Sequence, residues 1–174
     1  MKKIFFALIF ISLIGQYSCI IDQDRYKETE IFEEFETQKG FLILHLPPVL
    51  FKMVMSLSDE TRAESKEILD KVEVIKILFF QESENTKFTV SELKSKIHEN
   101  LKEFEYNLLT RIAKEDTDVS IYTIDKESVI YEVLVLMESD DEYVGFNLVG
   151  KLTKEEVFKV YKMINTENIQ NIQN

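Results

Sequence analysis

The chain has 174 residues, 45% of them hydrophobic, with only four glycines and two prolines, which excludes collagen-like and loop-rich proteins. It carries 32 acidic and 21 basic residues, a formal net charge of −11. Such a surface repels polyanions, so we expect no nucleic-acid partner. A single cysteine, Cys19, excludes an internal disulfide.

The first residues have the pattern of a bacterial lipoprotein leader. Lys2 and Lys3 precede an apolar run over residues 4–14, which is too short to span a bilayer, and Gln16-Tyr17-Ser18 then leads to Cys19. We therefore expect lipidation at Cys19, membrane attachment through its acyl groups, and a location in the bacterial cell envelope, on the periplasmic face or the cell surface. Because Gln16 stands where lipoprotein signals usually have Leu, an ordinary secretory peptide or an uncleaved anchor remains the alternative.

This interpretation divides the chain into four parts: a signal peptide over residues 1–18, a tether over 19–27, one domain over 28–164 and a disordered tail over 165–174. The tail is rich in Asn and Gln and cannot form a core. Without the leader, 19 basic residues remain against 32 acidic ones, a net charge of about −13. The mature chain is long enough for a single core.

In the first half of the domain, apolar spacing predicts a short helix over 28–38 and a strand over 41–46. Pro47 and Pro48 end that strand and start a helix over 49–57, because proline suits the first helical turn. A polar helix over 58–70 follows. Residues 72–80 are apolar on both sides, which predicts a central strand.

In the second half, Thr89 and Glu92 form a capping-box pattern before a long amphipathic helix over 90–112. Its apolar residues are Val90, Leu93, Ile97, Leu101, Phe104, Leu108 and Ile112. Three strands follow, over 119–124, 129–137 and 143–149, with connectors short enough to require antiparallel pairing. Thr153 and Glu156 open a last helix.

The order β-α-α-β-α-β-β-β-α predicts an α+β fold: a two-layer sandwich with one mixed or antiparallel sheet of about five strands and helices on one face. Within it, residues 145–151 match most of a phosphate-binding loop. Leu152 replaces the required Ser or Thr, however, and the alternation of Val144, Phe146 and Leu148 predicts a strand with Gly150 in a turn after it. We therefore expect no bound nucleotide.

Residues 116–127 match a calcium-binding loop only in part, and we expect a strand there instead. Asp116, Asp118, Ser120 and Glu127 have the right spacing, but Ile121 occupies the position that needs glycine. Asp140, Asp141 and Glu142 are expected to form a charged hairpin turn. His45 and His98 have no metal-ligand spacing, and no nucleophile motif is present, so we expect no metal, cofactor or catalytic residue.

Three segments resemble a family of lipoproteins from Bacteroidetes-type bacteria that carry a domain of unknown function, DUF4252. They are FLILHLPPVLFKMVM, VEVIKILFF and VIYEVLVLMESDDEYVGFNLVGKLTKEEV, within residues 32–164. The resemblance implies an α+β fold and an envelope location, and it implies no catalytic residues.

The sequence thus favours an envelope lipoprotein with a non-catalytic role in protein interaction, assembly or signalling, through a protein partner that it does not identify. The alternative is a periplasmic or surface domain that binds a small ligand or acts on it as an enzyme. Exposed apolar residues on a flat surface favour the first, and a deep polar pocket favours the second.

Overall fold

The computed structural model describes residues 26–55, 67–84, 86–113 and 117–165. Cys19, the leader, the tail after residue 165 and most of the predicted helix over 58–70 lie outside this part of the chain. The elements in chain order are η1 (Glu33–Phe35), β1 (Phe41–Leu46), α2 (Pro48–Met55), β2 (Val72–Gln81), α4 (Val90–Glu103), β3 (Asn107–Ala113), β4 (Asp118–Lys126), β5 (Val129–Glu138), β6 (Glu142–Leu152) and α5 (Lys154–Asn165).

The strands form one six-stranded sheet in the order β1-β2-β6-β5-β4-β3, and each pairing in it is antiparallel. The α+β class and the hairpins β4-β5 and β5-β6 are confirmed. The predicted five-strand count is wrong, because β3 is a sixth strand at the edge beside β4. The central position of β2, between β1 and β6, is also as predicted.

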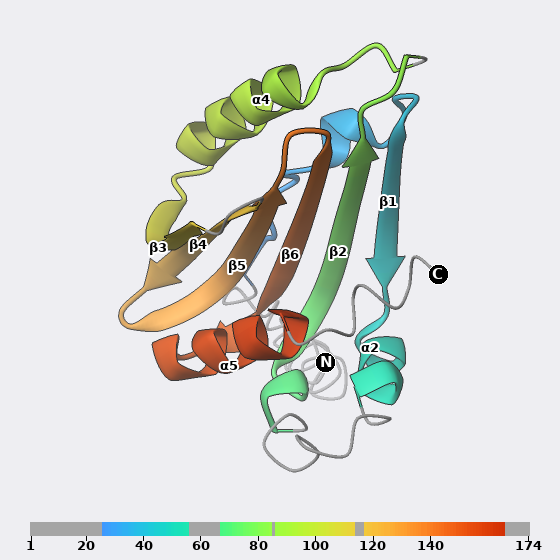
Figure 1. Cartoon of the computed structure of the whole chain (residues 1–174). Helices are drawn as coiled ribbons and strands as arrows, with labels where there is room; N and C mark the ends of the chain where they lie inside the picture. Colours follow the sequence, from blue (N-terminus) through green and yellow to red (C-terminus); the bar gives the residue numbers. More distant parts are fainter. Residues whose placement is uncertain (1–25, 56–66, 85, 114–116, 166–174) are drawn as a thin grey trace, which may run out of the picture.

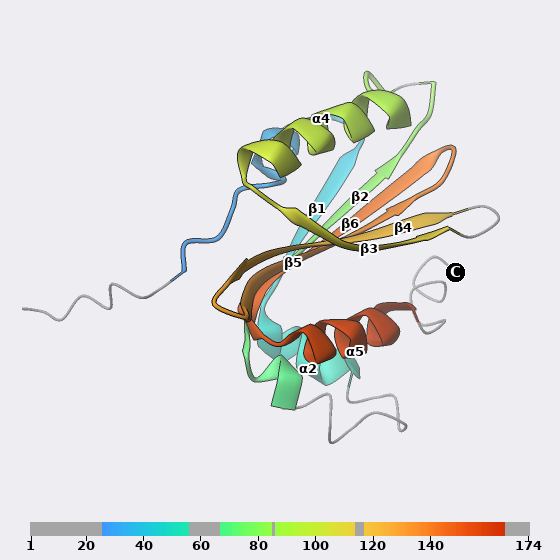
Figure 2. The same cartoon turned by 90° about the vertical axis from the view of Figure 1, so that its left-hand side faces the viewer.

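Helices cover both faces of this sheet, so the prediction of two layers with helices on one face is wrong. Figure 1 shows the strands with α4 at one end of the drawing and α2 and α5 at the other, and Figure 2 shows that α4 lies on the opposite side of the sheet from α2 and α5. We call these two sides the α4 face and the α5 face. Residues 26–40, the N-terminal segment, pack on the α4 face with α4.

Each face has its own hydrophobic core because side chains alternate along every strand. The α5-face core contains Ile75, Ile77, Val119, Ile121, Val133, Val135, Phe146 and Leu148 with Val157 and Val160 of α5. The α4-face core contains Leu78, Phe80, Leu134, Leu136 and Tyr143 with Leu93, Ile97 and Leu101 of α4 and Ile31, Phe32 and Phe35 of the N-terminal segment. The central strands are therefore buried on both sides.

The predicted helix over 90–112 is the largest local error. The capping box of Thr89 and Glu92 is present, but α4 ends at Glu103, and Glu105 has a left-handed φ of 58° that reverses the chain into β3. Phe104 still packs at the edge of the α4-face core, whereas Leu108 is on β3 and 56% exposed. The four-residue spacing that suggested a continuing helix is also two strand repeats, so it fits β3 equally well.

Two smaller predictions are also wrong. The segment over 28–38 contains only the 3₁₀ turn η1, although its apolar residues Ile31, Phe32 and Phe35 are fully buried as a helical face would be. Gly150 lies within β6 and not in a turn. A Cβ atom there would come within 2.4 Å of the Lys71 carbonyl oxygen, so this close approach of two backbones requires glycine.

Candidate functional site

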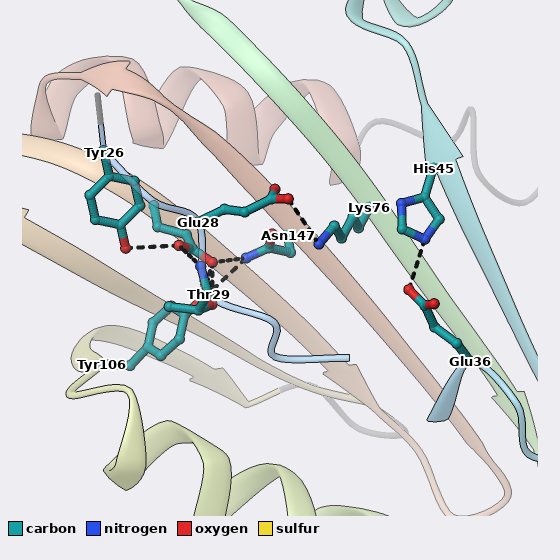
Figure 3. Close-up of polar contacts among 9 residues, drawn as sticks. Tyr26, Glu28, Thr29, Glu36, His45, Lys76, Tyr106 and Asn147 are labelled. Atoms are coloured by element: carbon teal, nitrogen blue, oxygen red, sulfur yellow. Dashed lines mark hydrogen bonds and ion pairs between the residues drawn. The ribbon is translucent and has the colours of Figure 1, made fainter. Parts of the chain in front are cut away.

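The most unusual group in the described part of the chain is the carboxylate of Glu132, which is fully buried on the α4 face of β5. It accepts five hydrogen bonds. The residues that donate them, Tyr26, Thr29, Tyr106 and Asn147, are labelled in Figure 3. Oε2 accepts from the Tyr26 hydroxyl at 2.9 Å and from the Thr29 backbone N–H at 3.0 Å. Oε1 accepts from the Thr29 hydroxyl at 2.5 Å, from Asn147 Nδ2 at 2.6 Å and from the Tyr106 hydroxyl.

These donors come from three places in the sequence. Tyr26 and Thr29 belong to the N-terminal segment, Tyr106 lies between α4 and β3, and Asn147 is on β6 next to β5. Glu132 thus joins the N-terminal segment to the sheet, more than 100 residues away along the chain. The Tyr26 ring also stacks on Tyr131, with ring centroids 5.2 Å apart.

The two tyrosines are held in the protonated, hydrogen-donating state. Burial raises the pKa of Tyr26 and of Tyr106 well above the usual value, and the nearby negative charge of Glu132 and the hydrogen bonds to it raise both further. A hydrogen bond to a charged group contributes about 1.5–3 kcal/mol. Five of them compensate for the loss of hydration that burial of a carboxylate requires.

Apolar contacts strengthen the same attachment. Phe32 of the N-terminal segment packs over Gly145 of β6, where a Cβ atom would come within 2.6 Å of the Phe32 ring. Asn100 of α4 donates from Nδ2 to the Ile31 carbonyl oxygen at 3.3 Å and to Glu34 Oε1 at 2.8 Å. The absence of a side chain at Gly145 therefore provides the space in which the segment binds.

Beside this cluster lies a shallow cleft of about 290 Å³, lined by Tyr26, Lys27, Glu28, Glu73, Val74 and Val149. Lys76, almost fully buried, forms an ion pair with Glu28 Oε1 at 3.4 Å. The buried side-chain oxygens Glu28 Oε2 and Asn147 Oδ1 have no hydrogen-bond partner among the described residues. The cleft is at the lower limit of volumes usual for ligand sites.

The geometry of Glu132 suits attachment better than catalysis. Both carboxylate oxygens are occupied by donors of the protein itself, which leaves no free position for a substrate or a proton transfer. Within the described residues, no three His, Cys, Asp or Glu side chains are placed to hold a metal ion. The cluster therefore fixes the N-terminal segment, which leads back toward Cys19, onto the sheet.

The residues singled out by motif are dispersed in the fold. Residues 145–151 lie in β6 and residues 118–126 in β4, which confirms the strand predictions for both pseudo-motifs, while Asp116 lies outside the described residues. His45, at the end of β1, is 2.9 Å from Glu36, and His98 is exposed on α4. Asp140 and Asp141 lie in the β5-β6 turn as expected, and Glu142 begins β6.

Sequence reasoning missed the Glu132 cluster, although one signal was available. Glu132 and Asn147 are polar residues inside two apolar strand runs, at positions that alternate with Val133 and Phe146. A polar residue in a run buried on both sides needs a partner, so two such residues on neighbouring strands predict a buried polar contact. Tyr26 and Thr29 carry no comparable signal, because their role depends on the path of the N-terminal segment.

A second candidate is the free edge of the sheet at β1. In the described part of the chain, β1 pairs only with β2, and its register has no irregularity over six residues. Leu42 and Leu44 point to the same side of the strand and are 54% and 37% exposed. The other edge strand, β3, has an irregular register after Leu108 and carries Arg111.

Comparison with known proteins gives the family of the chain. No curated protein matches the sequence. None of the described helices is both long and apolar enough to cross a membrane. The family model of DUF4252, a domain of unknown function, matches residues 35–160, which include Tyr106, Glu132 and Asn147 but not Tyr26 or Thr29. The chain belongs to the DUF4252 family.

Proposed function

We propose that the protein is an envelope lipoprotein, acylated at Cys19, and that its domain is a non-catalytic interaction module. The module binds an extended segment of another envelope protein, which adds to β1 as a further strand. Within the described residues β1 pairs with no strand other than β2, and this open edge is the observation that carries the proposal. The leader pattern before Cys19 supports the location.

The contrast between the two sheet edges supports the choice of β1. Soluble proteins protect edge strands with charged side chains, proline or bulges, since an unprotected edge pairs with other chains. β3 has such protection in Arg111 and its irregular register, whereas β1 is regular, has no Lys, Arg or Pro and exposes Leu42 and Leu44. An edge of this kind is typical of domains that bind partners by strand addition.

The chemistry of the partner segment follows from the two properties of this surface. Leu42 and Leu44 require apolar side chains at alternate positions of the added strand, because side chains on one face recur every second residue. The strongly acidic chain favours basic residues elsewhere in the segment. The partner is thus an extended, basic and apolar segment.

The alternative of a small-ligand site or an enzyme has less support. The cleft beside Tyr26 is shallow and small, and it is not a deep polar pocket. The buried carboxylate of Glu132 is occupied by donors of the chain itself. Strand addition at β1 uses a surface that is already exposed.

Site-specific photo-cross-linking in the native cells tests the proposal. A photoreactive residue at position 42 or 44 of the full chain should cross-link to partner residues two apart in the partner sequence, as strand pairing requires. A probe at Leu108, which is equally exposed on β3, is the control and should give no such adduct. Leu44→Lys should remove the adduct from position 42 without lowering the melting temperature.

Three results would contradict the proposal. Equal adducts from positions 42 and 108 would show that exposure alone determines cross-linking. Adducts scattered over the partner sequence would exclude a paired strand. An adduct of twice the mass of the chain would identify a second copy as the occupant of β1 and exclude a different partner protein.

A further inference from the structure

The helix α2 has exposed apolar side chains on its outer surface. Phe51 faces inward, where its ring lies 6.2 Å from that of Phe146 in the α5-face core. Val49 and Leu50 face outward and are 61% and 48% exposed, and Met53 is also exposed. We call Val49 and Leu50 the α2 surface. An exposed apolar patch of this kind marks a contact with another molecule or a membrane.

The composition of α2 also differs from that of the other described helices. Its eight residues, PVLFKMVM, contain no acidic side chain, in a protein with 32 of them. Its only charge is Lys52, which forms an ion pair with Asp70 at 2.6 Å. Anionic lipid headgroups repel carboxylates, so α2, which has no acidic residue, is better suited than α4 or α5 to approach a lipid surface.

The α2 surface lies at the same end of the sheet as the start of the N-terminal segment. Lys52 contacts Asp70, just before β2, and the cleft beside Tyr26 includes Glu73 and Val74 at the start of β2. In the register, Leu46 at the end of β1 pairs with Ile75, so the chain enters α2 at this same end. Figure 1 shows α2 at the ends of β1 and β2.

The distance to the acylated residue limits how far this end can lie from the membrane. Six residues lie between Cys19 and Tyr26, and the seven residue steps that join the two span at most about 25 Å when the chain is fully extended. A domain of this size is roughly 35–40 Å across. Because the Glu132 cluster fixes Tyr26 to the sheet, the end that carries α2 stays closer to the lipid than the opposite end does.

We infer that the α2 surface docks onto the lipid bilayer that holds the acyl chains of Cys19, with Val49 and Leu50 in the headgroup region. This inference rests on the proposed acylation of Cys19. Interfacial helices bury their apolar face at the boundary between headgroups and acyl chains. The acyl anchor keeps α2 at a high local concentration near the surface, so a small apolar contact is sufficient to orient the domain. Docking through α2 leaves β1 accessible to a partner.

Tryptophan fluorescence tests the inference, because the chain contains no tryptophan. The full acylated protein with Leu50→Trp is reconstituted in phosphatidylethanolamine and phosphatidylglycerol vesicles, with and without bromine on the acyl chains. Bromine quenches tryptophan only at short range. We expect the Leu50→Trp emission to shift to the blue in vesicles and to be strongly quenched by the brominated lipid. Val49→Trp is a second reporter of the same surface if Leu50→Trp does not fold.

Leu108→Trp is the matched control, since Leu108 is exposed to a similar extent on β3. Its emission should be unchanged by either lipid. A protein that gains no acyl mass and does not float with the vesicles would overturn both the proposed acylation and this inference. A protein that is acylated and floats, but whose Leu50→Trp or Val49→Trp emission is no more quenched than that of Leu108→Trp, would overturn this inference alone and leave the α2 surface to a protein partner.

Discussion

The substitution Glu132→Gln should destabilise the domain strongly although it changes one atom. The glutamine NH₂ group cannot accept a hydrogen bond, so placed at Oε2 it leaves the buried Thr29 backbone N–H without an acceptor, while the Tyr26 hydroxyl has to rotate and accept from the NH₂ group instead of donating. Each buried donor without a partner costs about 1–3 kcal/mol. The three bonds to Oε1 remain but lose the assistance of the negative charge, which about doubles the strength of a hydrogen bond.

The expected total is about 3–6 kcal/mol, a large part of the 5–15 kcal/mol by which a domain is usually stable. Urea unfolding of the full chain, followed by far-UV circular dichroism, measures it. Glu73→Gln is the matched control, since Glu73 is an exposed residue of β2 and its change should stay within about 0.5 kcal/mol. Equal unfolding midpoints for the two variants would refute the assignment of Glu132 as the acceptor that attaches the N-terminal segment.

Three further predictions concern the same face of the sheet. Leu101→Ala should lower the free energy of unfolding by about 2–5 kcal/mol, because Leu101 is in the core. Lys102→Ala should lower it by less than about 0.5 kcal/mol, because Lys102 is exposed. Equal effects of the two substitutions in urea unfolding would contradict this. Gly145→Ala should cost about 1–3 kcal/mol by displacing the Phe32 ring, and an unchanged melting temperature would exclude that contact. Because the pKa of Tyr106 is raised in the fold, its hydrogen bond to Glu132 contributes fully to the free energy of unfolding below pH 10. This contribution is lost progressively as the pH rises above 10. In the Tyr106→Phe variant the free energy of unfolding should therefore decrease less steeply with pH above pH 10 than in the unsubstituted protein. Equal slopes of the free energy of unfolding against pH would contradict this.

Local patterns predicted most of the strands because these depend on short-range alternation. β1 is found at its predicted bounds, and β2, β4, β5 and β6 extend the predicted ranges by one to three residues at their ends. The capping boxes at Thr89 and Thr153 marked the starts of α4 and α5 for a similar reason, since the two residues that form each box are three apart.

The layer arrangement could also have been predicted, because β2 is apolar on both sides and such a strand needs cover on both faces. β3 was harder to predict. Its separation from α4 depends on Glu105 in a left-handed conformation, which is rare for a residue other than glycine and has no pattern in the sequence. Within the Glu132 cluster, the contacts with Tyr26 and Thr29 join residues more than 100 positions apart, which no local spacing encodes.

A measurement of the proposed acylation at Cys19 is the most direct test of the proposed function. The protein is purified from membranes of the native cells, and the intact mass and the N-terminal peptide are measured beside those of Cys19→Ala. We expect a mature chain that begins at Cys19 and carries the mass of the lipid, and a Cys19→Ala variant that takes up no labelled fatty acid and leaves the membrane fraction. An unmodified Cys19 in the native protein, or a Cys19→Ala variant that still takes up fatty acid and stays in the membrane, would contradict the proposal.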